Sequence, residues 1–479
     1  MIPDLPTELF VGGAWRKASD AGTFPVEDPA TQQVIATVAD GTVEDGRAAA
    51  AAAAAALPAW SSRPPRERAE ILRRTYELII RAKDELAALI TAENGKTRTD
   101  AVGEAAYAAE FFRWYSEEAV RITGHVGHAP GGDKRIIEIS QPVGVALLLT
   151  PWNLPAAMIT RKVAPALAAG CTVVVKPSHH TPLTALFLAR LFAEAGIPDG
   201  VVNVVPTTRD TAVTADLVSD SPVRALSFTG STRVGSALLG QAAERVLKTS
   251  MELGGNAPFI VLSDADLDAA VAGALVAKMR HNAEACTAAN RFYVHASVHE
   301  EFVARLGKGL AALEVGPGSW PSAQVGPMAS AATRDLLAEA VESAVGSGGR
   351  VVLGGSPLRG PGYFFPPTLI DAVPPSAPVL DHELFGPVAP VVTFDTDAEA
   401  ITMANATEMG LGAYVYTRDL RRGLGLAEQL ESGMVGLNVG VLSDPAAPFG
   451  GVKQSGIGRE GGRHGIHEFL ETKYIATQW

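Results

Sequence analysis

The chain has 479 residues, of which 47% are hydrophobic and 19% charged, and its formal net charge is −12 at pH 7. A chain of this length is expected to form about two to four domains, and its negative charge disfavours nucleic acids and anionic membranes as partners. The only two cysteines, Cys171 and Cys286, exclude a disulfide framework and a thiolate metal site. Such cysteine usage suits the reducing cytoplasm, which is the predicted location.

The chain is predicted to carry no signal peptide and no membrane-spanning segment. MIPDLPTELFVGGAW contains acidic residues and an early proline but no basic region or apolar core, so we expect no signal peptide. The longest uncharged apolar stretch, residues 163–175, is short for a membrane span and contains a proline and a glycine. The alanine run at 48–56 predicts an ordinary surface helix, because alanine is the best helix former.

From residue 145 onward, short apolar runs alternate with helical patterns. Helices are predicted at 156–169, 183–195 and 233–247, and they separate the strand-like runs VALLLT, CTVVVK, VVNVV, VRALSF and KTSMEL. Strands that alternate with helices form βαβ units, in which a parallel sheet is covered on both faces. This part of the chain therefore predicts a first α/β domain.

A second alternating series follows Glu252. Helices are predicted near 267–279, 298–312 and 330–345, between strands such as RFYVHA, RVVLGG, APVVTF, GAYVYT and GMVGLNV. Two successive α/β domains with a cleft between them are the simplest interpretation. GHVGHAPGGDKRIIEISQ and HEFLETKYIATQW have strand character but fit neither domain, and they predict pairing between subunits in an oligomer.

The first of three strand-to-helix turns with polar side chains is TPWNLP, residues 150–155. It ends a parallel strand, at the edge where open α/β sheets bind ligands. Asn153 either caps the following helix or donates an amide N–H to an oxyanion, and the stretch alone leaves both interpretations open.

The other two turns, KPSHHTP and FTGSTRVG, suit a nucleotide. Lys176 either holds a ribose hydroxyl or phosphate or is a solvated charge at a strand end. Backbone N–H groups in FTGSTRVG can face a pyrophosphate at a helix N-terminus, although this turn matches neither GxGxxG nor a Walker A loop. His179 and His180 would point apart on a strand, so we expect no metal site there.

An acid and a cysteine complete the set of reactive groups. MELGGN ends an apolar strand in Glu252, which is either a functional acid or base or an exposed loop carboxylate. Cys171 lies in a β run and is expected to be a buried structural cysteine. Cys286 follows Glu252 in the chain. A cysteine nucleophile, an oxyanion donor and a general base are what aldehyde oxidation through a thioester requires.

Over essentially its whole length the chain resembles the NAD(P)-dependent aldehyde dehydrogenases. The matching strings are TPWN, AAGCTVVVKPS, SFTGSTRVG, ELGGNAPFIV, the EAC cysteine, ELFGPVAPV and PFGGVKQSGIGRE. The resemblance implies an α/β fold with two Rossmann-like parallel-sheet domains and a β oligomerisation flap. The NAD(P)-binding domain would comprise 1–122 and 144–251, the catalytic domain 252–462, and the oligomerisation segments 123–143 and 463–479. It also implies a homodimer or homotetramer.

The resemblance assigns roles to individual residues. Cys286 would be the nucleophile, Glu252 the base for the deacylating water, and Asn153 with the Cys286 backbone N–H the oxyanion hole. Because the branch that acylates coenzyme A usually lacks this glutamate, Glu252 favours hydrolysis to a carboxylic acid. The cofactor, NAD or NADP, would be bound by Thr150, Trp152, Lys176, Ser178, His179, Gly230, Ser231, Glu383 and Phe385.

Stretches such as DKRIIEISQPVGV and PAAMITRKVAPALAAGC are most similar to succinate-semialdehyde dehydrogenases. In that subfamily two arginines and a serine bind the far carboxylate of the substrate, and the resemblance assigns them to Arg161, Arg291 and Ser443. A planar guanidinium binds a carboxylate through two hydrogen bonds, and two buried arginines need an anion. The predicted reaction is oxidation of succinate semialdehyde to succinate. The alternatives are a broad-specificity enzyme for uncharged aldehydes and a non-catalytic NAD(P)-binding homologue.

Four positions depart from the family pattern or vary within the family. Ala283 and Glu284 stand where Gly and Gln are usual, and we expect a charged Glu284 to raise the pKa of the cysteine. Ala288 replaces the second cysteine of a redox switch. His179 occupies a position where NAD-preferring relatives often have a glutamate, which favours competence for NADP while leaving NAD open.

Overall fold

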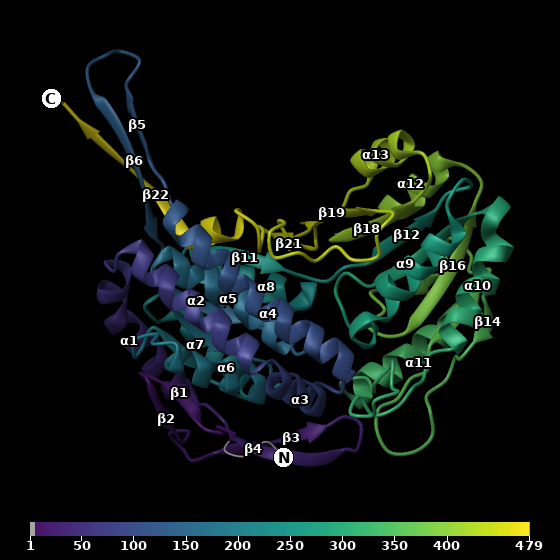
Figure 1. Ribbon diagram of the computed structural model, residues 1–479, viewed down its shortest axis with the longest axis horizontal. Helices are drawn as coiled ribbons and strands as arrows, with labels where there is room; N and C mark the ends of the chain where they lie inside the picture. The colour runs from purple at the N-terminus through teal and green to yellow at the C-terminus, as the bar shows by residue number, and fades with distance from the viewer. Residues whose placement is uncertain (1–4, 479) are drawn as a thin grey trace.

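The first sheet of the structure collects strands from three parts of the chain (Figure 1). The computed structural model describes residues 5–478. The strand order is β2-β1-β9-β8-β7-β10-β11-β21. The central strands are parallel and comprise β9 (Val202–Val204), β8 (Thr172–Lys176), β7 (Val145–Leu149), β10 (Val223–Thr229) and β11 (Lys248–Glu252). Antiparallel edges come from β1 (Leu9–Val11), β2 (Ala14–Arg16) and β21 (Gly456–Ile457).

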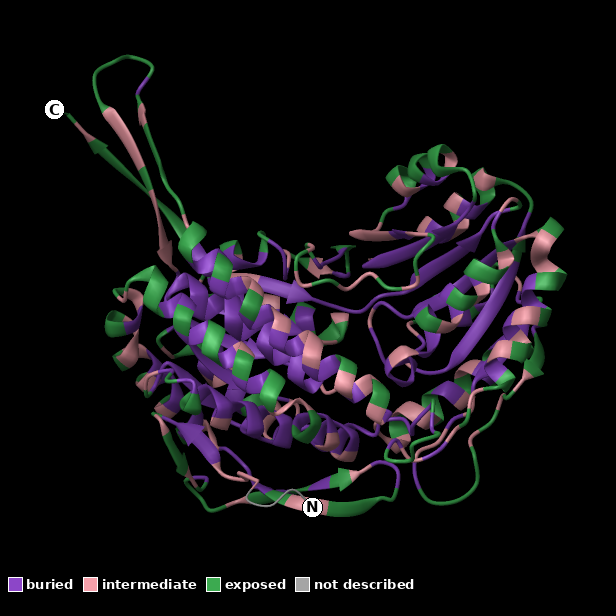
Figure 2. Cartoon of the chain, viewed as in Figure 1, coloured by how far each residue is buried: buried purple, intermediate pink, exposed green. Residues whose placement is uncertain are grey.

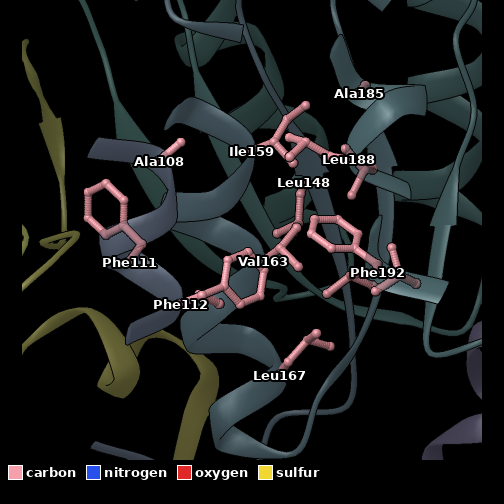
Figure 3. Close-up of a cluster of buried hydrophobic side chains, with 14 of the residues drawn as sticks. Ala108, Phe111, Phe112, Leu148, Ile159, Val163, Leu167, Ala185, Leu188 and Phe192 are labelled. Carbon is pink, nitrogen blue, oxygen red and sulfur yellow. The ribbon is translucent and has the colours of Figure 1, made fainter. Parts of the chain in front are cut away.

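Helices cover this sheet and carry most of the buried apolar surface. They are α1 (Val43–Ser61), α2 (Pro65–Arg81), α3 (Lys83–Asn94), α4 (Arg98–Glu118), α5 (Pro155–Ala169), α6 (Pro182–Glu194), α7 (Asp210–Ser219) and α8 (Thr232–Ala243). Figure 3 shows how Phe112 of α4, Val163 of α5 and Phe192 of α6 meet Leu148 of β7 in one core. Because all fifteen residues of α5 are buried, this helix is fixed between the sheet and the outer helices.

The alanine run forms α1, as predicted, but the helix is only half exposed. Thr42 caps its N-terminus, where the Thr42 hydroxyl and the Asp45 carboxylate exchange hydrogen bonds with each other's backbone N–H groups. Ala49, Ala50 and Ala53 are fully buried in the core on the other face of the first sheet. The small side chains therefore allow close packing in addition to favouring a helix.

The second sheet has the order β14-β15-β16-β13-β12-β18-β19. Its strands are β14 (Arg350–Leu353), β15 (Thr368–Asp371), β16 (Val388–Phe394), β13 (Ala289–His295), β12 (Ala257–Val261), β18 (Gly412–Tyr416) and β19 (Met434–Leu437), all parallel to their neighbours except β14. Around it lie α9 (Leu267–Met279), α10 (His299–Ala311), α11 (Ala331–Gly346), α12 (Asp397–Asn405) and α13 (Leu420–Gln429). The predicted α/β fold with two parallel-sheet units is confirmed.

A third sheet projects from the body of the molecule (Figure 1). It joins β5 (His125–His128), β6 (Arg135–Pro142) and β22 (Leu470–Thr477), and β22 pairs with β6 along its whole length. Figure 2 shows that its residues are mostly exposed or half-buried. These strands come from the two segments predicted to form a flap. The domain boundaries stay a prediction, and residues 1–4 and Trp479 of the outer segments lie outside the described residues.

Two small antiparallel pairs complete the strands: β3 (Thr23–Asp28) with β4 (Gln33–Ala39), and β17 (Met409–Gly410) with β20 (Val452–Lys453). Most predicted helices and strands from residue 145 onward appear within a few residues of their expected ends, while α7 is an element that the sequence patterns did not indicate. Between residues 5 and 478, no helix is long and apolar enough to cross a membrane.

Candidate active site

Two of the three predicted catalytic residues, Asn153 and Cys286, line one cavity between the two sheet units, and Glu252 directly precedes Leu253 of its lining. This cavity has a volume of 310 Å³, and its lining includes Asn153, Cys286 and Glu383 together with Trp152 and Phe385. Asn153 follows β7, while Cys286 lies in the loop between α9 and β13. A Cβ atom on Gly255 would lie 2.3 Å from the carbonyl oxygen of Cys286, so only glycine allows this approach to the cysteine loop.

The loop before Cys286 is held in an unusual backbone conformation. His281, Asn282 and Ala283 have φ angles of 56°, 58° and 62° in succession, a left-handed conformation that costs a non-glycine residue about 1 kcal/mol or more. The Asn282 side chain holds the loop in place by accepting from the backbone N–H of Gly326 at 2.8 Å and donating to the carbonyl of Pro327 at 3.1 Å. The cysteine is thus presented by a strained and firmly anchored turn.

The Cys286 side chain is half-buried at the cavity and its thiol is difficult to ionise. Burial raises the pKa of this thiol to about 12, against the effect of the Arg161 guanidinium, while nearby carboxylates including Glu252 add to the rise. The expectation that Glu284 raises this pKa is not supported. Burial raises the pKa of Glu284 itself to about 8, and its Oε1 accepts from the backbone N–H of Ala329 at 2.9 Å, so it carries little charge at neutral pH.

Asn153 does not act as a helix cap. Glu104 Oε1 instead accepts hydrogen bonds from the first backbone N–H groups of α5, those of Ala156 and Ala157, at 2.8 and 3.3 Å. The Asn153 Nδ2 donates to the backbone carbonyl of Glu284 at 2.9 Å, which ties it to the cysteine loop. The backbone carbonyl of Asn153 accepts a hydrogen bond from Lys96 Nζ. Of the two interpretations of Asn153, the geometry favours an oxyanion donor.

Glu252 ends β11, as predicted, and it is buried rather than exposed in a loop. Its Oε2 has no hydrogen-bond partner. Burial first, and then the charge of Glu460, raise its pKa well above the usual range, although Arg161 and Lys162 act in the opposite direction. A carboxylate with a raised pKa is a stronger base than a free one, which suits a general base.

Arg161 belongs to a buried ionic cluster that includes a residue missed in the sequence. Its Nε lies 2.6 Å from Glu460 Oε2, and its guanidinium carbon lies 4.1 Å from the centre of the Phe449 ring. Lys162 Nζ lies 2.5 Å from Glu460 Oε1 and donates to Ser227. Glu460 is the carboxylate paired with both cations, and Glu252 acts on the same two cations from further away, so the cluster links Arg161 to the predicted base.

A second cavity of 220 Å³ is lined by Ser443, Tyr107, Arg280 and His281. Two carboxylates also line it but already have partners, since Glu104 pairs with Lys96 and Asp100 accepts from the backbone N–H of His281. The Tyr107 hydroxyl is buried without a hydrogen-bond partner. Burial raises the pKa of Tyr107, while Arg161, Arg280 and Ser443 act to lower it, which indicates that all three lie near this hydroxyl. Arg280 and Cys286 both act on the pKa of Tyr414 as well, so the second cavity lies close to the nucleophile.

Arg291 does not join Arg161 and Ser443, which corrects the sequence-based assignment. It is 2% exposed and lines neither cavity. Its Nε donates to the carbonyl of Asn256 at 2.9 Å, and its other nitrogens donate to the carbonyls of Met403 and Ala404 and to the Tyr293 hydroxyl. These contacts occupy four of its five N–H groups, so Arg291 holds the backbone together and Arg280 is the arginine of the cavity.

A third cavity of 590 Å³ lies along the carboxyl ends of β7, β8 and β10 and suits a dinucleotide. Six of the predicted cofactor residues line it alongside Trp152, which it shares with the first cavity: Thr150, Lys176, Ser178, His179, Gly230 and Ser231. The hydroxyls of Thr150 and Thr229 are buried here without partners, and Ser231 caps the N-terminus of α8. Unpaired hydroxyls and a positive helix end fit a ligand that carries ribose and phosphate groups.

Glu383 and Phe385 line the first cavity, where the nicotinamide end of such a ligand would meet Cys286. Glu383 Oε1 accepts from the backbone N–H of Gly255 at 3.1 Å, and burial raises the pKa of Glu383 to about 7. The Phe385 ring packs edge-on against Trp152 with the ring centres 5.5 Å apart. All nine predicted cofactor residues therefore line one of two adjoining cavities.

The two histidines of KPSHHTP do not point apart as expected. His179 and His180 lie in a turn rather than on a strand, and their ring centres are 4.3 Å apart. Within the part of the chain that the structure describes, no three His, Cys, Asp or Glu side chains are grouped as metal ligands. Cys171 is fully buried, and burial raises the pKa of its thiol to about 12, as a structural cysteine requires.

Comparison with known proteins gives a single answer. Residues 15–475 match the model of the aldehyde dehydrogenase family. A succinate-semialdehyde dehydrogenase of Paenarthrobacter nicotinovorans is 53% identical over 92% of this chain and 98% of its own. A glutarate-semialdehyde dehydrogenase of Pseudomonas aeruginosa is 49% identical over 98% and 97%.

The fold agrees with solved structures of the same kind. An NADP-dependent enzyme of E. coli superposes with a TM-score of 0.98 at 45% identity, covering 99% of this chain and 98% of its own. The match extends over both sheet units and the projecting flap, so it includes every cavity described above. The chain belongs to the aldehyde dehydrogenase family.

Proposed function

We propose that the chain oxidises a short aldehyde that carries a carboxylate at its far end, with succinate semialdehyde as the preferred substrate and NAD(P)⁺ as the hydride acceptor. The observation that carries this proposal is the second cavity, in which Arg280, Tyr107 and Ser443 lie beside the Arg161 cluster. An apolar tunnel suits an uncharged aldehyde, whereas two arginines and two hydroxyls suit a carboxylate. Relatives that are named for succinate and glutarate semialdehydes support the same substrate class.

The far carboxylate fixes the orientation of the substrate. With this group on Arg280 and Ser443, the aldehyde end is directed to Cys286, because the two cavities adjoin. Anchoring at a distance converts binding energy into alignment of the reacting carbon with the sulfur.

The Cys286 thiol gives up its proton to solvent as the sulfur adds to the carbonyl carbon, and the resulting oxyanion accepts hydrogen bonds from the Asn153 amide and from the backbone N–H of Cys286. NAD(P)⁺ supplies the chemistry of hydride acceptance when it is bound. Asn153 is well placed for its role because its other amide hydrogen is already fixed by the Glu284 carbonyl. The product of this half-reaction is a thioester on Cys286.

Glu252 completes the reaction by taking a proton from the water that attacks the thioester. Its burial raises its pKa, which makes its carboxylate a stronger proton acceptor than a free glutamate. Cleavage of the carbon–sulfur bond releases the dicarboxylic acid and restores the cysteine.

We also propose that the third sheet joins copies of the chain into a homodimer or homotetramer. Val126 on β5 and Tyr474 on β22 are 65% and 54% exposed on strands that project away from the body. Such strands gain burial by packing against a second copy. Light scattering after size-exclusion chromatography tests this: a monomeric mass would contradict it. The cytoplasmic location stays a prediction.

The substrate proposal is tested by steady-state rates of the purified chain on succinate semialdehyde, glutarate semialdehyde and butanal, each with NAD⁺ and NADP⁺. Butanal matches succinate semialdehyde in length but lacks the carboxylate. We expect kcat/KM for the semialdehyde to exceed that for butanal by about a hundredfold, which corresponds to one charged hydrogen-bonded contact. Equal values for the two aldehydes would overturn the proposal.

A further inference from the structure

One carboxylate in the third cavity has no role in the reaction described above. Asp210 is the first residue of α7, and its side chain lies against the lysine at the end of β8. It forms an ion pair with Lys176 Nζ through Oδ1, and its Oδ2 lies 3.2 Å from His179 Nδ1. All three side chains line the cavity that suits the dinucleotide.

Asp210 carries a negative charge at neutral pH. Partial burial alone would raise its pKa, but the hydrogen bond with His179 and the positive charge of Lys176 outweigh burial and lower the pKa to about 2. Its side chain is 41% exposed, so it faces the cavity rather than filling the core. The Asp210 carboxylate therefore holds a negative charge beside Lys176, a lysine that we assign to the cofactor.

The other ionisable groups that line this cavity do not restore the positive charge of Lys176 that Asp210 neutralises. Burial and the neighbouring His179 lower the pKa of His180 to about 4, so His180 is neutral at pH 7. Arg233 also lines the cavity but belongs to the first turn of α8, next to the turn suited to the pyrophosphate. Around Lys176 itself, the carboxylate of Asp210 therefore sets the local charge.

We propose that Asp210 determines how far the chain discriminates between NAD⁺ and NADP⁺, by disfavouring the 2′-phosphate of NADP⁺. This inference rests on the proposed function only in that both need a dinucleotide in the third cavity. A ribose 2′-hydroxyl can donate a hydrogen bond to a carboxylate, whereas a 2′-phosphate adds a charge of about −1.5 to −2 beside an existing negative charge. The carboxylate and the 2′-phosphate would repel each other, and the positive charge of Lys176 is already paired with Asp210.

The sequence pointed to position 179, where a histidine repels nothing. In the structure the carboxylate comes instead from α7, 31 residues further along the chain, and it reaches both Lys176 and His179. Asp210 thus restrains the competence for NADP that His179 alone would allow.

The test uses Asp210→Asn, which removes the charge and keeps the shape. The first readout is binding of two half-cofactors by titration calorimetry: adenosine 5′-monophosphate and adenosine 2′,5′-bisphosphate. We expect the affinity for the bisphosphate, relative to the monophosphate, to rise about tenfold in the variant. Because neither compound undergoes reaction, this result is independent of the aldehyde that the chain oxidises.

The second readout is the ratio of kcat/KM for NADP⁺ to that for NAD⁺ with succinate semialdehyde, which should rise by a similar factor. Asp216→Asn is the matched control, because Asp216 lies on the same helix but pairs with Arg47 outside the cavity. Asp210→Ser repeats the test if the asparagine variant is unstable. The proposal is overturned if both ratios stay within twofold of the original chain, or if affinity for the two half-cofactors changes in parallel.

Discussion

The nucleotide side and the cysteine side of the active site are built in different ways. Lys176, Ser231 and Glu252 each lie at or just beyond the end of a parallel strand, where a regular βα unit fixes the backbone. Cys286 lies instead in a loop whose preceding residues adopt left-handed φ angles. Regular units place side chains through local sequence, whereas the cysteine loop depends on contacts from distant segments such as 326–329.

The same contrast separates the two candidate substrate arginines. Arg291 lies on the regular strand β13 and is fully engaged with backbone carbonyls. Arg280 lies at the irregular end of α9 and faces the second cavity. A regular strand thus supplies an arginine for architecture, and an irregular turn supplies one for recognition.

The largest effect on activity is expected from Glu252, the proposed general base at the end of β11 on the nucleotide side of the site. Glu252→Gln should lower steady-state kcat by about a thousandfold, because the thioester forms but water is not activated. A stopped-flow burst of reduced cofactor in the first turnover should persist. If the burst and the steady-state rate fall together, Glu252 acts before deacylation rather than in it.

The next effect concerns stability rather than rate. Arg291→Met should reduce the free energy of unfolding by about 3 kcal/mol, because it leaves several buried carbonyls without donors. The ratio of kcat/KM for succinate semialdehyde to that for butanal should stay unchanged. Denaturant unfolding and rates on the two aldehydes measure both quantities, and a collapse of the ratio would restore Arg291 to the substrate site.

A smaller, pH-dependent effect is expected at Glu284. Its folded pKa of about 8 lies above the value of an unfolded glutamate, so its contribution is fully present at acidic pH. This contribution is lost as the pH rises toward 8, because over this range the folded state keeps a proton that the unfolded state has already released. Glu284→Gln should therefore gain about 2 to 4 kcal/mol relative to the original chain between pH 5 and pH 9, the upper figure being three pH units at about 1.4 kcal/mol each. Parallel curves of Tm against pH for the two proteins would contradict the assignment.

The smallest effect is expected from Ala283→Gly. Glycine adopts a φ of 62° without strain, but it loses a buried methyl group and gains freedom in the unfolded chain. The balance predicts a gain of about 0.5 kcal/mol. Differential scanning calorimetry measures it, and a loss of more than about 1 kcal/mol would show that methyl packing outweighs backbone strain.

Local patterns predicted much of the fold. The central strands of the first sheet are short apolar runs between turn residues, and α9 was predicted at its observed bounds. Helices α7, α12 and α13 escaped detection because they have only nine or ten residues each, whereas the predicted helices have twelve or more, so their apolar pattern repeats too few times to be recognised. Asp210 begins α7, and its role in the cavity was therefore not visible in the sequence.

The site residues show the same difference between what local sequence patterns reveal and what only tertiary contacts decide. Cys286, Asn153 and Glu252 were predicted as a group because each lies in a distinctive string, and their catalytic roles stay a prediction. In the structure Asn153 and Cys286 line one cavity, and Glu252 lies close enough to act on the pKa of Cys286. Arg280 was missed although it precedes the cysteine by six positions in KMRHNAEAC, where a cation so close to the nucleophile was an available signal. The direction of a side chain on a strand, which excluded Arg291, follows from tertiary contacts that no local pattern contains.

The central claim is that Arg280 recognises a carboxylate on the substrate, and its most direct test is the substrate selectivity of Arg280→Met. Rates on succinate semialdehyde and butanal are compared with those of Arg280→Lys, which keeps the charge, and of Arg421→Met, which removes an exposed arginine from α13. We predict that Arg280→Met lowers kcat/KM for succinate semialdehyde about a hundredfold and leaves butanal within a few-fold, while Arg421→Met changes neither. An equal loss on both aldehydes, or no loss on the semialdehyde, would contradict the claim.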